Sequence, residues 1–149
     1  MGRRKVELKL SSNRGEPNQG IQSILLEIVE YLQQEGSLIL AILFGSRATE
    51  TATSRSDIDI LAIFDGLPEN TSLAPPENIP LGVDILAVPE KNFIEGLTEG
   101  KGLFIEAMTR GRILFGEEQV VQKYLAQAKR TIKHLRMVRT EIGWKRNPR

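Results

Sequence analysis

The chain has 149 residues, of which 40% are hydrophobic, and it carries a formal net charge of +1 at pH 7. This size and apolar content suit one domain with a real core, and they exclude a polymerase with separate fingers and thumb. The small net charge gives no overall case for binding nucleic acid, because affinity for the phosphate backbone needs concentrated positive charge. The absence of cysteine excludes disulfides and thiolate metal sites.

Residues 1–18 are polar and contain several turn formers, which predicts a flexible arm before a single domain at residues 19–149. The alternation within Val6–Leu10 fits a short edge strand. No apolar run has the length of a signal-peptide core or of a membrane span, so we expect a soluble, cytoplasmic protein without a membrane partner. From Ile21 to Gly36, apolar residues recur at helical spacing and predict a helix that packs one face on a sheet.

The next segment, Leu38–Phe44, is a nearly continuous apolar run of strand length that stops at Gly45-Ser46. The residues after this turn predict a short polar helix. Its free N–H groups and the positive end of its dipole suit phosphate.

Two carboxylates open the following predicted strand. Asp57 and Asp59 flank Ile58, so the two-residue period of a strand puts both carboxylates on one face. Leu81–Val88 is another strand-like run whose one charge is Asp84, and a lone carboxylate in an apolar strand is costly unless it is paired or binds a metal. Hard oxygen ligands favour magnesium or manganese. Three such acids beside a phosphate-binding turn predict a magnesium–nucleotide site, although Asp-x-Asp alone also fits an ordinary turn.

Asp65–Pro80 contains four prolines and must be a loop. It joins the two strands that carry the acids, either as a plain connector or as a lid over the site. Two short helices at Pro89–Gly96 and Gly102–Thr109 and a short strand at Gly111–Gly116 follow. These elements predict an α/β (α+β) domain: a mixed sheet of about four strands with helices packed mainly on one face.

Glu117–Ile142 carries apolar residues at three- or four-residue steps, which predicts a long amphipathic C-terminal helix with cations in its later turns. Its apolar stripe either covers the sheet of this chain, or its later half, through Trp144, docks on a partner or on a second copy of the chain. Nucleic acid on the basic face is a weaker alternative. His134, the one histidine, fits a surface residue better than a catalytic base.

Gly45-Ser46, followed by Asp57-x-Asp59 and by Asp84 in the next strand, resembles the signature of the DNA-polymerase-β-like nucleotidyltransferase superfamily. The pattern is similar to that of its minimal nucleotidyltransferases, many of which act as antitoxins beside a HEPN-domain toxin. The similarity covers about residues 21–116. The chain departs from the usual sequence motif of these proteins at Glu50, where members often carry Gly.

The resemblance implies the nucleotidyltransferase fold and the transfer of a nucleoside monophosphate, AMP from ATP, with magnesium as cofactor. Asp57 and Asp59 would hold the Mg²⁺ that bridges the nucleotide phosphates. Asp84 would join them at a second metal position and could accept the proton of the attacking hydroxyl. Two metal ions about 4 Å apart stabilise both the attacking and the leaving oxygen of an in-line displacement.

The same resemblance implies that Ser46 Oγ and the amides after Gly45 hold the ATP phosphates, with Arg47 either adding charge or remaining solvated. The chain has no room for a domain that grips an antibiotic or a tRNA. The implied acceptor is therefore a tyrosine hydroxyl of a HEPN ribonuclease toxin, AMPylated by its antitoxin.

Two alternatives to protein AMPylation stay open. One is a non-catalytic module that neutralises its partner by occlusion through the C-terminal helix, which could also carry a homo-oligomer contact. The other is a nucleotidyltransferase for a small, aminoglycoside-type molecule that works with a second subunit.

Overall fold

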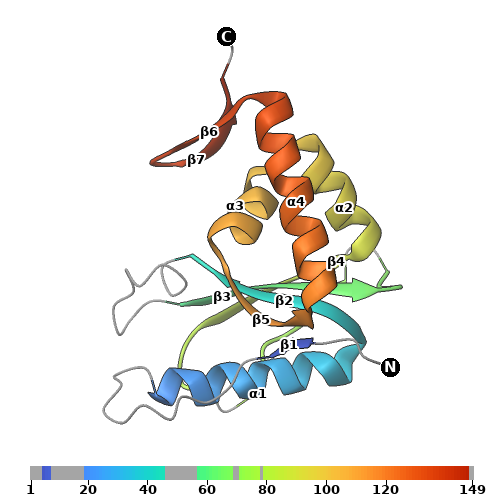
Figure 1. Cartoon of the computed structure of the whole chain (residues 1–149). Helices are drawn as coiled ribbons and strands as arrows, with labels where there is room; N and C mark the ends of the chain where they lie inside the picture. Colours follow the sequence, from blue (N-terminus) through green and yellow to red (C-terminus); the bar gives the residue numbers. More distant parts are fainter. Residues whose placement is uncertain (1–4, 8–18, 46–56, 69–70, 78, 148–149) are drawn as a thin grey trace.

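One sheet divides the chain into two layers (Figure 1). The computed structural model describes residues 5–7, 19–45, 57–68, 71–77 and 79–147. Within these ranges the elements are β1 (Lys5–Glu7), α1 (Gln19–Glu35), β2 (Ser37–Phe44), β3 (Ile58–Asp65), β4 (Val83–Pro89), α2 (Glu90–Glu99), α3 (Gly102–Arg110), β5 (Arg112–Glu117), α4 (Glu118–Leu135), β6 (Met137–Thr140) and β7 (Gly143–Arg146).

The main sheet has the strand order β1-β5-β2-β3-β4. Strands β3 and β4 are parallel, and the other neighbouring pairs are antiparallel. The predicted mixed sheet is therefore confirmed, and the short strand β1, paired with β5, adds a fifth member. The rest of the expected N-terminal arm, residues 1–4 and 8–18, lies outside the described residues.

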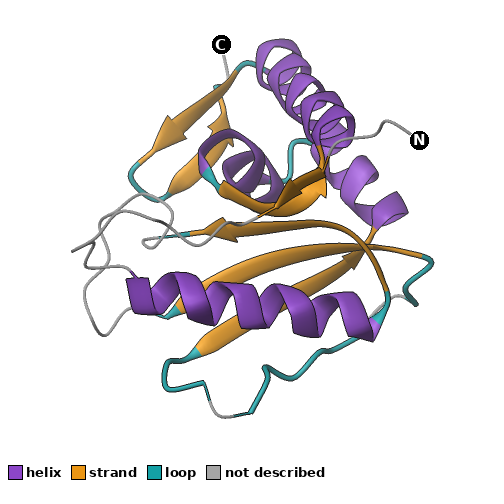
Figure 2. Ribbon diagram, turned by 60° about the horizontal axis from the view of Figure 1, so that its bottom comes forward, coloured by secondary structure: helices purple, strands orange, loops and turns teal. Residues whose placement is uncertain are grey.

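The two central strands are apolar at nearly every position because both of their faces are covered. Leu40 and Ile42 of β2 pack on α2, α3 and α4, whereas Ala41 and Leu43 pack on the α1 side. Figure 2 shows α1 lying along one face of the sheet. The other three helices cover the opposite face (Figure 1), so the prediction that helices lie mainly on one face is confirmed.

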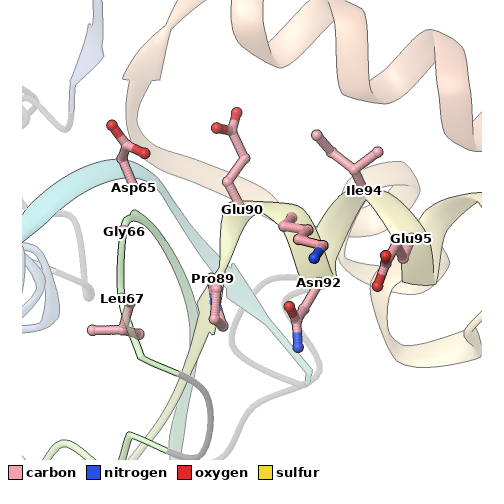
Figure 3. Close-up of a pocket in the computed structure, with 9 residues that line it drawn as sticks. Asp65, Gly66, Leu67, Pro89, Glu90, Asn92, Ile94 and Glu95 are labelled. Carbon is pink, nitrogen blue, oxygen red and sulfur yellow. The ribbon is translucent and has the colours of Figure 1, made fainter.

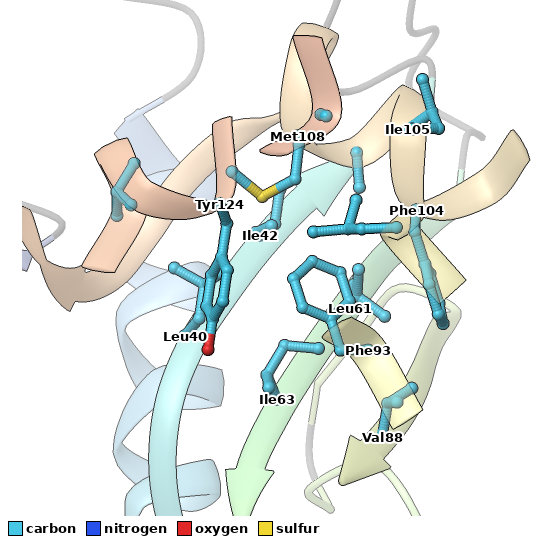
Figure 4. Close-up of a cluster of buried hydrophobic side chains, with 14 of the residues drawn as sticks. Leu40, Ile42, Leu61, Ile63, Val88, Phe93, Phe104, Ile105, Met108 and Tyr124 are labelled. Carbon is cyan, nitrogen blue, oxygen red and sulfur yellow. The ribbon is translucent and has the colours of Figure 1, made fainter. Parts of the chain in front are cut away.

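An aromatic cluster anchors the three-helix layer. The ring centroid of Phe93 from α2 lies 5.0 Å from that of Phe104 and 5.2 Å from that of Tyr124. Figure 4 shows these rings in one cluster with Leu61 and Ile63 of β3. Tyr124 donates its hydroxyl hydrogen to Glu90, so the polar end of this buried residue is satisfied at the rim of the core. The apolar stripe of α4 packs within this chain, because Val121, Tyr124 and Ala128 are buried in the same core cluster as residues of β2 and β3.

The loop after β3 is a connector that crosses the sheet. Because β3 and β4 are parallel, the chain must travel from the end of one strand to the beginning of the next. Leu67, Leu73 and Ile79 pack against the α1 layer on the way. The Tyr31 hydroxyl of α1 also donates a hydrogen bond of 2.5 Å to the Ala74 carbonyl. The described part of this loop is thus a crossover that packs on the α1 layer.

The helix predicted to run to Ile142 ends at Leu135, and the prediction was wrong beyond that residue. Arg136 adopts the left-handed conformation (φ 53°, ψ 49°), and its N–H caps the carbonyls of Ile132 and Lys133. The chain then forms the β6–β7 hairpin, in which Thr140 Oγ1 donates to the Gly143 carbonyl over 2.7 Å. The side chain of Ile142 at the hairpin tip is 97% exposed.

The partly buried carboxylate of Glu106 holds this hairpin on α3. Glu106 accepts two hydrogen bonds from the Arg139 guanidinium, of 2.9 and 3.0 Å, and one of 2.8 Å from Trp144 Nε1. Arg110 lies 3.5 Å from the same carboxylate. Trp144 therefore packs on the chain's own helix. None of the helices within the described ranges is long and apolar enough to cross a membrane.

Candidate functional site

The three predicted carboxylates lie at one edge of the sheet. Asp59 is the second residue of β3, and it pairs with Phe44 of β2 on one side and with Asp84 of β4 on the other. Asp57 directly precedes β3, where the Ile58 amide donates to the Gly82 carbonyl over 2.9 Å. The antiparallel β2 ends where β3 and β4 begin, so Gly45, which follows β2, lies at this same edge. These ends of the strands lie on the left of Figure 1.

Two glycines make room for these acids. A Cβ atom placed on Gly45 would lie 2.8 Å from Asp59 Oδ2, and Gly45 has a positive φ of 80°. A Cβ atom on Gly82 would lie 2.5 Å from Asp57 Oδ1. Real Cβ atoms do not come this close to another heavy atom, so any other residue at these two positions would make the neighbouring carboxylate shift. Sequence reasoning singled out Gly45 and missed Gly82; its place just before an apolar strand was the available signal.

The electrostatics of the edge centre on Asp59. Burial raises the pKa of its carboxyl group, and the neighbouring charges of Asp84 and Asp57 raise this pKa further. The pattern is that of acids that repel one another across a partly desolvated space. Such an arrangement is relieved by a proton or by a cation.

Asp84 differs from the expectation of a carboxylate enclosed in an apolar strand. It is exposed, and so is Leu86 two residues later. The reason is that β4 is the edge strand of the sheet, so one side of it faces solvent. The argument from the cost of burial therefore does not apply to Asp84, whereas its position beside Asp59 agrees with the predicted site.

The donor set fits a hard divalent cation, since it offers three carboxylates and no softer ligand. As the side chains lie, no group of three or more acidic or histidine residues in the described ranges is gathered closely enough to hold a metal ion. Ser46 and Arg47, the other predicted phosphate ligands, lie outside the described residues, as does the short helix predicted after them. His134 is exposed near the end of α4, as predicted.

A cavity of about 570 Å³ lies at the other end of the same strands. Its walls include Asp65 and Gly66 at the end of β3 and Pro89 and Glu90 where β4 meets α2 (Figure 3). Asp65 at its wall lies six residues after Asp59 on the same strand, a distance of about 20 Å at the usual rise per residue. This cavity is therefore separate from the carboxylate edge.

The family model described as polymerase β, nucleotidyltransferase, matches residues 27–120. This chain belongs to that family. The matched segment runs from within α1 to the beginning of α4, and it includes Gly45, Gly82 and the three carboxylates. Most of α4 and the β6–β7 hairpin lie beyond it.

Solved structures are also similar to this nucleotidyltransferase-family chain. A toxin–antitoxin crystal structure with AMP-PNP is 21% identical, with 74% of this chain and 88% of that chain covered and a TM-score of 0.49. A variant of the toxin–antitoxin MntA–HpeT is 18% identical, with coverage of 72% and 86% and a TM-score of 0.47. A candidate nucleotidyltransferase from Sulfolobus solfataricus is 30% identical, with coverage of 54% and 82% and a TM-score of 0.38. The comparison with curated proteins yields no match.

Proposed function

We propose that this protein transfers AMP from ATP to a hydroxyl group of a partner protein, and that it acts as the antitoxin of a HEPN ribonuclease toxin. The observation that supports the transfer reaction is the position of Asp57, Asp59 and Asp84 at the same end of β3 and β4, beside Gly45, within a segment that matches the nucleotidyltransferase family. The partner rests on the motif resemblance, because the toxin–antitoxin structures match with TM-scores below 0.5.

In this proposal Asp57, Asp59 and Asp84 hold Mg²⁺. The raised pKa of Asp59 and the mutual repulsion of the acids support a cation between them. When bound, Mg²⁺ would offset the negative charge of the nucleotide phosphates. The backbone beside Gly45, with Ser46 and Arg47, would orient the β and γ phosphates so that the α-phosphate faces the acceptor.

The reaction forms one bond and breaks one. The acceptor oxygen attacks the α-phosphorus, the bond from that phosphorus to the bridging oxygen breaks, and pyrophosphate leaves with the electron pair. The acceptor hydroxyl gives up its proton, and Asp84 is placed to take it because its exposed side chain lies beside Asp59 in the neighbouring strand.

Incubation with α-labelled ATP and Mg²⁺, with and without a co-expressed HEPN protein, tests the proposal. The wild type should label that protein, and Asp57→Asn/Asp59→Asn should not. Asp65→Asn is the matched control, because it removes an exposed carboxylate from the opposite end of β3. Label on small molecules alone would favour the aminoglycoside-type alternative. Neutralisation of the toxin that survives Asp57→Asn/Asp59→Asn, without label on any protein, would contradict transfer and favour occlusion.

A further inference from the structure

A second cavity, of about 750 Å³, lies against the C-terminal end of α4. Four of its lining residues are Arg130, Lys133, His134 and Arg136, and the α2 residue Thr98 closes one side. We call it the basic cavity. This end of α4 projects away from the sheet (Figure 1), so the basic cavity is separate from the carboxylate edge.

Among the described residues that line the basic cavity, none is a carboxylate. Within the part of the chain that the structure describes, no acid forms an ion pair with Arg130, Lys133 or Arg136. Arg130 Nη2 instead donates to Gln127 Oε1 over 2.8 Å, and Gln127 Nε2 donates to Thr131 Oγ1 over 3.2 Å. These three cations therefore line one cavity without an ion-pair partner among the described residues, and a bound anion would be attracted to all of them.

The helix dipole favours Lys133 and His134 in the last turn of α4, but it does not account for Arg130. Its favourable effect on positive charge falls off within the last turn, and Arg130 lies before that turn of α4. The carbonyls of Ile132 and Lys133 are also already capped by the Arg136 N–H. The cap in turn leaves the Arg136 side chain at the cavity wall.

Arg136 is the one non-glycine residue with a positive φ among the described residues. A left-handed helix cap is usually glycine, because a side chain costs free energy in that conformation. The Arg136 carbonyl accepts a hydrogen bond of 2.8 Å from the Asn147 amide, which fixes the cap from the other side. An unfavourable residue held in place at the wall of a cavity indicates a role for its side chain.

We propose that the basic cavity binds the phosphate groups of a nucleotide-sized ligand, at a site distinct from the carboxylate edge. Its volume lies in the range of small-molecule sites. Guanidinium groups match phosphate oxygens in pairs, and the Lys133 ammonium adds a point charge. ATP, AMP, pyrophosphate and inorganic phosphate share this chemistry. The inference goes beyond the proposed function and does not depend on it.

Binding is measured on the full-length chain carrying Asp57→Asn and Asp59→Asn, so that the carboxylate edge contributes little. ATP, AMP, pyrophosphate and inorganic phosphate are titrated separately, and the ring-proton signal of His134, the single histidine, reports on the cavity by NMR. At least one of the four should move this signal in a saturable way. Equal, weak effects of all four and of chloride would indicate only general screening and would overturn the proposal.

Arg130→Gln with Lys133→Gln should weaken binding of the ligand found at least tenfold. The matched control is Lys129→Gln, an exposed lysine of the same helix that does not line the cavity. An equal loss in this control would show that only the overall charge matters. An oligonucleotide that binds through Arg130 and Lys133, while all four small ligands fail to bind, would replace the proposal with an RNA site.

Arg136→Gly separates binding from structure. Glycine favours the left-handed cap, so this variant should raise Tm by roughly 2–5 °C. It should also lower the affinity for the phosphate ligand roughly three- to tenfold, because one guanidinium is lost. A higher Tm with unchanged affinity would mean that Arg136 is only a structural cap, and that result would overturn its part in the site.

Discussion

At the scale of single residues, Gly45 and Gly66 provide a test of what the carboxylate edge requires. Both have a positive φ, of 80° and 76°, but only Gly45 has a carboxylate where its Cβ would lie. Each Gly→Ala change should lower the free energy of unfolding by about 1 kcal/mol, because alanine is strained in this conformation. Only Gly45→Ala should also reduce the transfer of labelled AMP to the partner protein, by at least tenfold. Equal transfer by the two variants would mean that the close approach to Asp59 has no functional role.

The raised pKa of Asp59 predicts that the stability of the protein depends on pH. This pKa is raised in the folded protein by burial and then by Asp84 and Asp57, so the ionised form is disfavoured by folding. That penalty is full above the raised pKa and absent below the ordinary aspartate range, and stability therefore rises as pH falls through this interval. Asp59→Asn should remove the penalty at pH 7 and raise the free energy of unfolding by a few tenths of a kcal/mol, discounted for solvent exposure.

The measurement is urea unfolding of wild type and Asp59→Asn at several pH values, with Asp65→Asn as control. The advantage of Asp59→Asn at pH 7 should shrink as the pH falls, whereas Asp65→Asn should stay close to wild type. Lower stability of Asp59→Asn at pH 7 would show that the carboxylate makes a structural contact. An acid that costs stability where it stands is what a ligand site predicts.

At the scale of elements, the β6–β7 hairpin depends on one carboxylate. Glu106 joins Arg139 and Trp144 to α3. The hydrogen bonds from Arg139 are the main cause of the lowered pKa of Glu106. Glu106→Ala should lower the free energy of unfolding by about 1 kcal/mol and speed amide exchange across the hairpin. Because the folded pKa is lowered, this contribution is present above the ordinary glutamate range and is lost as pH falls through the folded pKa.

Hydrogen exchange with mass spectrometry locates the effect of Glu106→Ala. Peptides from β6 and β7 should exchange faster, whereas those from β3 should not change at pH 7. The control is Glu95→Ala, which removes an exposed carboxylate from α2. Uniformly faster exchange across the whole domain would contradict the view that Glu106 acts on the hairpin alone.

At the scale of the whole molecule, the sheet could be predicted from sequence because its central strands are buried on both faces, so each is a continuous apolar run. The alternation around Ile58 predicted that Asp57 and Asp59 share one face, whereas Asp84 was predicted from a cost of burial that its exposed side chain does not bear. The hairpin could not be predicted, because Val138 and Ile142 continue the helical spacing of α4 and the chain reverses at Arg136, a residue type that rarely adopts the left-handed conformation. The contact of Gly82 with Asp57 joins two elements, so its place before an apolar strand was the one sequence signal for it.

The two apolar clusters lie on opposite faces of one sheet, and this arrangement predicts a single cooperative unfolding transition. Leu25 is fully buried in the α1 layer, so Leu25→Ala should lower the free energy of unfolding by about 2–5 kcal/mol. Trp144, the single tryptophan, reports on the opposite layer by its fluorescence. Because β2 and β3 contribute to both clusters, the fluorescence and circular-dichroism midpoints should fall together. A fluorescence midpoint that stays at the wild-type value while the circular-dichroism midpoint falls would mean that the three-helix layer, with its hairpin, folds without α1.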